Sequence, residues 1–278
     1  MGRRIGVIAG SGRFVSLAVS GMRCRGFSCV IAGIKGEADR RLRKQADVFE
    51  WVRPGQAGRI VSFFKKHGLG EVLMLGKVRP SSIFRQDNFD NSGRLLLEGI
   101  KEKSPTTLLK AAIDYLESEG LDVVSPFSIL QPFFCEEGVL TKVQPSSDLA
   151  EDIDFGIRVA RRLADLDIGQ TLIVKNTAVV AVEGMEGTDQ TIQRGGKLAG
   201  KGFVAVKAAR TSQDMRMDVP AVGFDTVRCL IKAGAGALGL EAFQVAFFQK
   251  EEAVALADSN GLAIVVRAMP GAGGTRED

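Results

Sequence analysis

The chain opens with a short apolar run that ends in glycines. Residues 4–9 are mostly apolar and are followed directly by Gly10-Ser11-Gly12, after which apolar side chains recur at helical spacing. A second apolar run occupies residues 28–34. A buried parallel strand, a glycine turn, a helix and a second strand follow one another in this way at the start of an α/β domain. The sequence therefore predicts an α/β protein whose N-terminal domain is Rossmann-like, with a parallel sheet.

A proline-containing segment interrupts this pattern in the middle of the chain. Residues 126–147 contain three prolines and no sustained periodicity, so we predict a linker there. With 278 residues in all, the chain is long enough for two domains. We predict a Rossmann-like domain over residues 1–125 and a distinct α/β domain over residues 148–269. The tail 270–278, rich in glycine and charge, is expected to be disordered.

The second domain has its own local signals. A long amphipathic pattern over about 147–167 predicts a helix, and two alternating runs around Lys175-Asn176 predict a β-hairpin. Further strands are expected at 202–206, 237–240, 244–248 and 263–266, and helices at 225–233 and 250–260.

Charge and rare residues exclude several classes of function. The 37 Lys and Arg nearly balance the 33 Asp and Glu, and no long basic run exists, so we expect no nucleic-acid partner. The short basic stretch Arg40–Lys44 is interpreted as a solvated surface segment. A single histidine, His67, excludes metal sites built from several histidines.

Cysteine spacing and hydropathy indicate the compartment. The four cysteines form no C-x-x-C pair, which predicts reduced thiols and a cytoplasmic protein. No segment approaches the roughly 18 uninterrupted apolar residues of a membrane span. Contact with a membrane surface and homodimer formation both remain open.

The first candidate site is Gly10-Ser11-Gly12. Glycines after a strand let backbone N–H groups approach a phosphate at the N terminus of the next helix. The third glycine of the dinucleotide fingerprint is replaced by Val15, and no ribose-binding acid closes the second strand near Ile34. NAD is therefore disfavoured, and a tight turn without any ligand remains the alternative.

The second candidate, Lys77 and Arg79, follows the strand expected at residues 71–75. Loops at the carboxyl ends of parallel strands share one crevice, so these cations should converge with Gly10 and Gly12 on a diphosphate. The alternative is that both are ordinary surface charges.

The third candidate lies in residues 183–189, directly after an apolar strand. Here Thr188 and Asp189 stand where a helix begins, and they could bind a phosphate or, with Glu186, lie near Mg²⁺. The alternative is a capping turn in which Thr188 caps the helix.

The fourth candidate, residues 207–220, is the densest in charge. Asp214 and Asp218 offer carboxylates for a metal, while Lys207, Arg210 and Arg216 offer partners for an anion. Carboxylates, a divalent cation and basic side chains suit hydrolysis at phosphorus, where charge neutralisation carries much of the catalysis. A purely structural ion-pair loop is the alternative.

These segments together resemble a known family, the LpxI-type UDP-2,3-diacylglucosamine pyrophosphatases. The resemblance runs from residue 5 to about 266. The matching segments are Ile8–Gly12, Leu166–Gln170, Val182-Glu183, Glu186–Asp189, Gln213–Pro220 with Val222-Gly223, and Asn260–Leu262. One departure is that Phe14-Val15-Ser16 lacks the proline that family members often carry after the N-terminal glycines.

The resemblance implies a two-domain protein with a ligand cleft between the domains that holds a lipid, and it makes residues 148–269 the catalytic domain. Peripheral contact with the inner membrane would then be possible. The resemblance implies hydrolysis of UDP-2,3-diacylglucosamine, a lipid-linked nucleotide sugar, to 2,3-diacylglucosamine 1-phosphate (lipid X) and UMP in lipid A synthesis. The resemblance also implies that hydrolysis depends on Mg²⁺ and that Asp218 is the acidic residue responsible for catalysis. Mn²⁺ is the other cation that oxygen ligands would suit. Two alternatives from other classes remain, a non-catalytic nucleotide-sugar or lipid-binding regulator and a nicotinamide-dependent oxidoreductase.

The candidate residues can now be stated together. We predict that Asp218 and Asp214 are catalytic and hold the metal. The predicted substrate-binding residues are Gly10, Ser11, Gly12, Lys77, Thr188, Asp189, Lys207, Gln213 and Arg216.

Overall fold

The computed structural model describes residues 3–79, 89–100, 105–212, 214–216 and 219–269. The chain divides into two compact units. Unit 1 comprises residues 1–129 together with Asp214–Asp218, and unit 2 comprises residues 130–213 and 219–278. Both units are α/β, as the sequence predicts, and each has its own sheet.

Unit 1 is built on a five-stranded sheet. Its order is β3-β2-β1-β4-β5, and every neighbouring pair is parallel. The strands are β1 (Arg4–Ala9), β2 (Ser28–Ile34), β3 (Val48–Val52), β4 (Glu71–Leu75) and β5 (Asp122–Val123). This is the order of a doubly wound sheet. Successive strands are added toward one edge from β1 to β3 and toward the other edge from β4 to β5, so the strand order reverses between β1 and β4.

Helices cover both faces of this sheet. Side chains of β1, β2 and β4 that share one face pack against α2 (Ala57–Lys66) and α5 (Pro105–Ser118). The opposite face is covered by α1 (Arg13–Cys24), whose Val15, Val19 and Met22 are fully buried. Successive residues of a strand point to opposite faces of the sheet. Because helices cover both faces, these strands are apolar along most of their length. The described part of unit 1 also contains α4 (Asn91–Glu98) and η1 (Arg40–Lys44), a short 3₁₀ turn between β2 and β3.

Unit 2 contains a six-stranded mixed sheet and a two-stranded one. The larger has the order β6-β13-β11-β9-β7-β8, and the smaller pairs β10 with β12. The strands are β6 (Gly138–Val139), β7 (Thr171–Lys175), β8 (Ala178–Val182), β9 (Phe203–Lys207), β10 (Ala221–Gly223), β11 (Ala235–Glu241), β12 (Ala246–Phe248) and β13 (Ala263–Arg267). Three strands at the centre, β9, β11 and β13, run parallel, while β6 and β7 run antiparallel to their neighbours.

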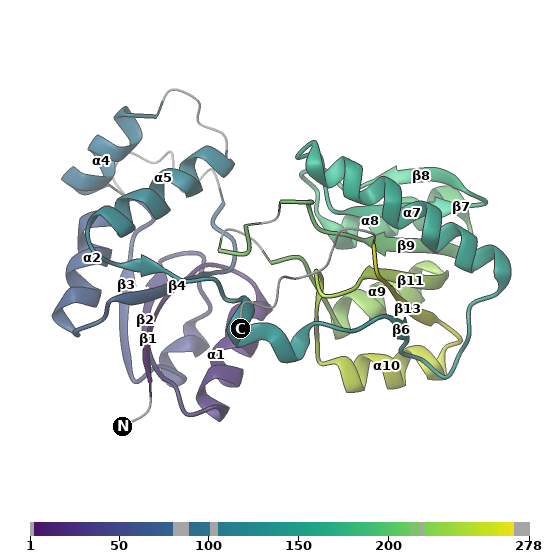
Figure 1. Ribbon diagram of the computed structural model, residues 1–278, viewed down its shortest axis with the longest axis horizontal. Coiled ribbons are helices and arrows are strands. Elements are labelled where there is room, and N and C mark those ends of the chain that lie inside the picture. Colours follow the sequence, from purple (N-terminus) through teal and green to yellow (C-terminus); the bar gives the residue numbers. More distant parts are fainter. Residues whose placement is uncertain (1–2, 80–88, 101–104, 213, 217–218, 270–278) are drawn as a thin grey trace. The chain divides into compact units, whose positions relative to one another are not determined.

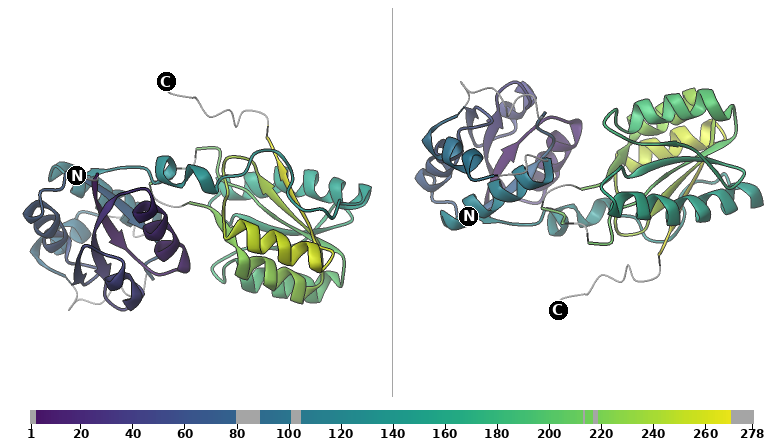
Figure 2. Two further views of the ribbon diagram at one scale, coloured as in Figure 1. Left: turned by 90° about the horizontal axis from the view of Figure 1, so that it is seen from below. Right: turned by 90° about the horizontal axis from the view of Figure 1, so that it is seen from above.

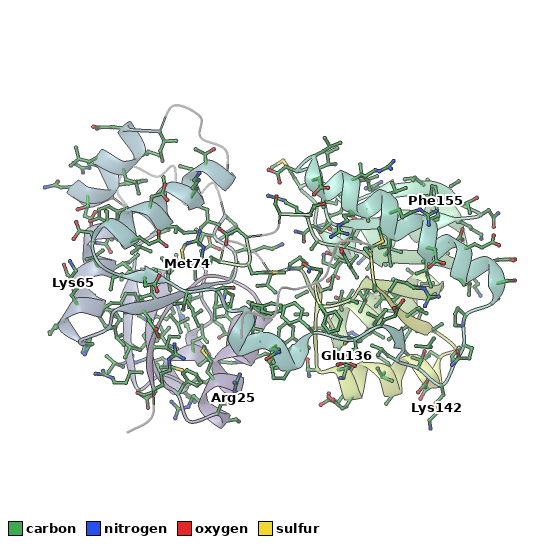
Figure 3. The ribbon with its side chains drawn as sticks, in the orientation of Figure 1. Arg25, Lys65, Met74, Glu136, Lys142 and Phe155 are labelled. Atoms are coloured by element: carbon green, nitrogen blue, oxygen red, sulfur yellow. The ribbon has the colours of Figure 1, made fainter. Side chains whose placement is uncertain are left out.

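The large sheet lies between two helical layers (Figures 1 and 2). One face packs against α7 (Ser147–Asp165), where Gly156 is needed because an added Cβ would lie 3.0 Å from side-chain atoms of Val174 and Val206. Phe155 of α7, labelled in Figure 3, is partly buried against the same cluster. The other face packs against α8 (Thr188–Ala199), α9 (Phe224–Ala233) and α10 (Lys250–Ser259).

The predicted elements of unit 2 are present, with differences at the edges. The hairpin predicted at Lys175-Asn176 is confirmed, since β7 and β8 pair antiparallel around that turn. The segment 126–147, predicted as a linker, contains α6 (Phe127–Leu130), η3 (Gln131–Phe133) and β6. It is more regular than its composition indicates because β6 adds to the edge of the sheet through pairing with β13. The predicted tail 270–278 lies outside the described residues.

Candidate active site

Polar side chains gather at one edge of the six-stranded sheet of unit 2. The parallel strands β9, β11 and β13 end at Lys207, Glu241 and Arg267, and Lys207 is opposite Leu240 while Glu241 is opposite Arg267. The antiparallel strand β7 begins at this edge, with Thr171 opposite Lys207. Ligands of open α/β sheets bind at the carboxyl ends of parallel strands, so this edge is the candidate active site.

A buried lysine is the centre of this edge. Lys207 is 5% exposed, and its Nζ donates to the Oγ1 atoms of Thr171 and Thr188, each at 3.1 Å. Its counter-ion is Glu183, whose Oε2 lies 3.6 Å from Nζ and whose side chain is also buried. Thr188 in turn donates to Glu183 Oε1 at 2.8 Å. A charge buried at this depth is retained only where an opposite charge and hydrogen bonds compensate its lost hydration.

Local backbone features bring these residues together. Glu183 follows β8, where its N–H donates to the Thr171 carbonyl at 2.8 Å. A side chain at Gly169 would collide with the Glu183 carbonyl, because an added Cβ would lie 2.0 Å from that oxygen. The N-cap of α8 is Gly187, with φ of 83°, so the alternative interpretation, in which Thr188 caps this helix, is wrong. Its hydroxyl instead points to Glu183 and Lys207, one position inside the helix.

Lys207, Thr171, Thr188 and Glu183 are called here the Lys207 cluster. A second acid beside it holds the start of the loop that follows β9. Glu241 is 1% exposed, and its Oε2 accepts the N–H of Ala209 at 2.9 Å. Its other oxygen lies 3.3 Å from Arg161 Nη2 on α7. Burial raises the pKa of Glu241 above its usual value, and the Ala209 hydrogen bond and Arg161 only partly oppose this.

Two further acids hold the same loop. Asp165 accepts the N–H of Thr211 at 2.7 Å and its hydroxyl at 2.9 Å. Arg210 forms an ion pair with Asp167. The loop that leaves β9 is therefore fixed over residues 209–211 by three carboxylates, and it leads directly to the charged segment 213–218.

The segment Glu186–Asp189, at the start of α8, contributes another ion pair. Glu186 accepts from Arg194 Nη2 at 2.5 Å and from the Thr191 hydroxyl at 3.2 Å. The Arg194 hydrogen bond is the main reason that the pKa of Glu186 lies below its usual value. Asp189 is exposed on the first turn of α8, and no described interaction connects its side chain with the Lys207 cluster.

The charged segment after the loop is only partly described. Asp214 binds Arg216 through hydrogen bonds of 2.9–3.2 Å to the backbone N–H, Nε and Nη2, and the Arg216 side-chain bonds are the main reason that the pKa of Asp214 is lowered. Arg216 also donates to Glu117 Oε1 at 2.8 Å within unit 1. Gln213 and Asp218, predicted as substrate-binding and catalytic residues, lie outside the described residues.

The described residues do not by themselves form the predicted Mg²⁺ site. In the part of the chain that the structure describes, no group of three or more His, Cys, Asp or Glu side chains could hold a metal ion. The Asp214 carboxylate, one of the two predicted ligands, is engaged with Arg216. The second predicted ligand, Asp218, is outside the described range.

In unit 1, the structure brings the predicted loops together. Ser11 and Lys77 form an isolated antiparallel bridge in which Ser11 N donates to Lys77 O at 2.7 Å and Lys77 N donates to Ser11 O at 2.9 Å. The Gly10 N–H donates to the Leu75 carbonyl at 2.7 Å. These amides are therefore engaged within the protein, and any phosphate at this turn would rely on Gly12 and the first amides of α1. Gly12 is exposed, with φ of 118°.

Arg79, the other predicted cation of this loop, is bound to the segment that follows β2. Its Nε donates to Glu37 Oε1 at 3.0 Å, and its Nη2 donates to the Gly36 carbonyl at 3.1 Å. Glu37, three residues beyond β2, has a side chain that is only 2% exposed.

Three residues of the active-site edge, Thr171, Glu183 and Glu241, were not among the predicted site residues, although Glu183 lies in a segment that resembles the family. Thr171 and Glu241 read as ordinary strand ends. Their common signal is position, because each is a polar residue at the end of an apolar strand. That signal identifies them only once the strand order is known.

Comparison with known proteins agrees with this division of the chain. The LpxI N-terminal domain model matches residues 4–133, and the LpxI C-terminal domain model matches residues 136–265. The UDP-2,3-diacylglucosamine pyrophosphatase LpxI of Caulobacter vibrioides is 28% identical over 275 residues, covering 95% of this chain and 97% of that protein. A solved structure of UDP-glucose-4-epimerase from Stenotrophomonas maltophila, with bound NAD and formylated UDP-arabinopyranose, is 16% identical and covers 43% of this chain and 34% of that one, with a TM-score of 0.29.

The two family models leave out only the first three residues, two residues between them and the last thirteen. Among the described residues, no helix has the length and apolar character needed to cross a membrane. The resemblance drawn from the separate motifs is thus confirmed over both units, and the chain belongs to the LpxI family.

Proposed function

We propose that this protein hydrolyses the diphosphate bond of UDP-2,3-diacylglucosamine, giving 2,3-diacylglucosamine 1-phosphate and UMP in lipid A synthesis. The observation that carries this proposal is the match along nearly the whole length of the Caulobacter vibrioides pyrophosphatase. The alternatives, a lipid-binding regulator and a nicotinamide-dependent oxidoreductase, have no comparable support.

The Lys207 cluster supports the proposal chemically. Its ammonium group and the Thr188 hydroxyl are 3.1 Å apart at the start of α8. A cation, a hydroxyl donor and the N-terminal end of a helix all favour phosphate oxygens, and they stabilise the negative charge that develops as a diphosphate bond breaks. We infer that Lys207 and Thr188 bind the substrate diphosphate, while Glu183 fixes both side chains in position.

The loop after β9 leads along the chain from Lys207 to Asp218, the predicted catalytic residue. Glu241, Asp165 and Asp167 fix residues 209–211, and Asp218 follows seven residues after Thr211. We propose that Asp218 acts on the attacking water or its metal and that Asp214 orients Arg216. The dependence on Mg²⁺ or Mn²⁺ rests on the family resemblance and on the shortage of histidine and clustered cysteine, which leaves oxygen atoms as ligands.

The direct experiment is to incubate the purified protein with UDP-2,3-diacylglucosamine and Mg²⁺ and to measure UMP. Release of UMP with equimolar diacylglucosamine 1-phosphate is expected. Binding of the lipid without turnover would support the regulator, and substrate-dependent oxidation or reduction of a nicotinamide would support the oxidoreductase.

The variant that tests the role of Asp218 is Asp218→Ala. Its control is Asp225→Ala, on the first turn of α9. A carboxylate that acts in the transition state contributes about 10²–10⁴-fold to the rate. We expect Asp218→Ala to fold and to lose at least that much activity, while Asp225→Ala retains it. Wild-type turnover by folded Asp218→Ala protein would remove Asp218 from the mechanism.

A further inference from the structure

The connection between β2 and β3 in unit 1 presents a compact group of cations. Its 3₁₀ turn η1 is fixed by Leu42, which is 0% exposed, and by Asp39, whose side chain accepts the Arg41 N–H at 2.8 Å. Because the one apolar residue of the turn points inward, the others point outward. The exposed basic residues of this connection, called here the η1 surface, are Lys35, Arg40, Arg41, Arg43 and Lys44.

The five positive charges of the η1 surface are only partly offset locally, by the carboxylate of Asp39. Over the described ranges, none of these five side chains forms an ion pair. The acids of the same connection form no described ion pair with these five side chains, since Glu37 pairs with Arg79, Asp47 binds Arg23 and the Cys29 N–H, and Asp39 accepts the Arg41 backbone N–H. Other basic residues of unit 1 do have partners, such as Arg59 with Glu50 and Lys65 with Glu119.

The end of α1 extends this basic region. Arg23 Nη1 donates to the carbonyl of Gln45, the C-cap of η1, at 2.8 Å. Arg25 follows α1 and is exposed (Figure 3). The charge of the chain as a whole is also uneven, because residues 1–129 contain 21 Lys and Arg against 13 Asp and Glu, whereas residues 130–278 contain 16 against 20. The small net charge of +4 therefore conceals a basic N-terminal half.

We propose that the η1 surface binds the anionic surface of a phospholipid bilayer. The choice of partner rests on the proposed function, because a substrate with two acyl chains resides in a membrane. Basic residues close to an anionic bilayer each strengthen binding by about fivefold, and the effect weakens as salt screens the charges. A nucleic acid is the less favoured partner, because the η1 surface has no aromatic side chain on which a base could stack.

The experiment measures cosedimentation of the full-length protein with vesicles of phosphatidylcholine alone or with 30% phosphatidylglycerol. The test variant is Arg40→Gln/Arg41→Gln/Arg43→Gln/Lys44→Gln. The control, Lys66→Gln/Arg94→Gln/Lys197→Gln/Lys232→Gln, removes the same number of exposed charges from scattered positions. We expect the wild type to bind only the anionic vesicles at low salt and to be released by 0.5 M NaCl. The test variant should bind at least tenfold more weakly, and the control within threefold of wild type.

Three results would overturn the proposal. They are no vesicle binding by the wild type, equal losses in the test and control variants, and binding by the test variant that matches wild type. A parallel titration with single-stranded RNA gives the alternative partner, which would be favoured if the test variant lost RNA binding and kept vesicle binding.

Activity in detergent micelles separates this proposal from the proposed function. The test variant should hydrolyse substrate in neutral micelles at the wild-type rate, because its residues lie outside the candidate active site. Vesicle binding by a protein without hydrolase activity would leave the η1 surface assigned and the function rejected.

Discussion

Lys207 ends a strand whose five side chains are all buried, and at 5% exposure its charge is costly to keep there. Glu183 and the hydroxyls of Thr171 and Thr188 compensate that cost, so the four side chains form one electrostatic unit. An apolar residue would be cheaper at this position if packing were the only requirement. Under the proposed function, this charge is retained because Lys207 binds the anionic substrate.

The substitution Lys207→Met tests this explanation. Loss of the cation should lower kcat/KM by about 10²–10³-fold, the range seen when a group that stabilises developing charge is removed. The control is Lys175→Met, since Lys175 at the other end of β7 donates to the carbonyls of Ala199 and Lys201 at 2.9 and 2.7 Å. Both variants should lose stability, but only Lys207→Met should lose activity per folded molecule. Equal kcat/KM values for the two would mean that Lys207 is structural.

Glu241 gives a residue-scale prediction about pH. Burial raises its pKa, so the folded protein binds this proton more tightly than the unfolded chain does. The stability that this proton contributes is complete below the usual glutamic acid range, about pH 4.3, and is lost as pH rises through the folded pKa. The free energy of unfolding of wild type, measured against Glu241→Gln by urea denaturation, should therefore fall as pH increases.

The opposite sign is expected at Glu186, whose pKa is lowered chiefly by Arg194. The stability contributed by its charge is present above the usual range and is lost as pH falls below it. The difference between wild type and Glu186→Gln should therefore be constant from pH 5 to 8 and should shrink in more acidic buffer.

For Glu241, the opposite result would be a difference in free energy of unfolding between wild type and Glu241→Gln that grows as pH rises. It would show that the ion pair with Arg161, rather than burial, dominates the pKa of Glu241.

At the scale of elements, the β7–β8 hairpin shows how a helix fixes a turn. Asn176 and Thr177 have φ values of 52° and 54°, a conformation that costs free energy for residues other than glycine. Their N–H groups donate to the two carboxylate oxygens of Asp152 on α7, at 3.0 and 2.5 Å. Asp152 is 3% exposed, so these hydrogen bonds are protected from water.

We predict that Asp152→Ala destabilises unit 2 by about 3 kcal/mol, because two hydrogen bonds to a buried charged group are lost. The control is Asp154→Ala on the same helix, whose half-exposed carboxylate pairs with Arg267 at 2.9 Å. An exposed pair contributes little, so this variant should remain within about 0.5 kcal/mol of wild type. Urea midpoints followed by circular dichroism give the comparison, and similar midpoints for both variants would contradict the role of Asp152.

The elements differ in how well the sequence predicts them. Alternating apolar residues around Lys175-Asn176 are a local signal, and the hairpin was predicted from them. The strand β3 was missed because Val48–Val52 contains Glu50 and is buried only at Val52, so it has no apolar run. The candidate site likewise combines residues that a local pattern identifies with residues that it does not. Thr188 and Lys207 lie in local motifs, whereas the pairing of Lys207 with Thr171 depends on strand order, which no local pattern gives.

At the scale of the whole molecule, each unit places its candidate residues at the carboxyl ends of parallel strands. In unit 1 these are the Gly10–Gly12 turn after β1 and Lys77 after β4, where the strand order reverses. In unit 2 they are Lys207 and Glu241. Two independent sheets thus follow the general rule for ligand sites in open α/β folds. The segment Asp214–Asp218 groups with unit 1 although its neighbours in sequence belong to unit 2.

Metal removal tests the proposed chemistry of the intact protein. With one histidine and no cysteine pair, oxygen atoms are the available ligands, and these suit Mg²⁺ or Mn²⁺ better than Zn²⁺. We predict that excess EDTA abolishes UMP release and that Mg²⁺ or Mn²⁺, added beyond the chelator, restores it. Circular dichroism should be unchanged by EDTA, because the hydrogen bonds and ion pairs that fix the candidate site come from the protein itself. Full activity in EDTA would show that the cations of the chain, Lys207 among them, neutralise the diphosphate without a metal.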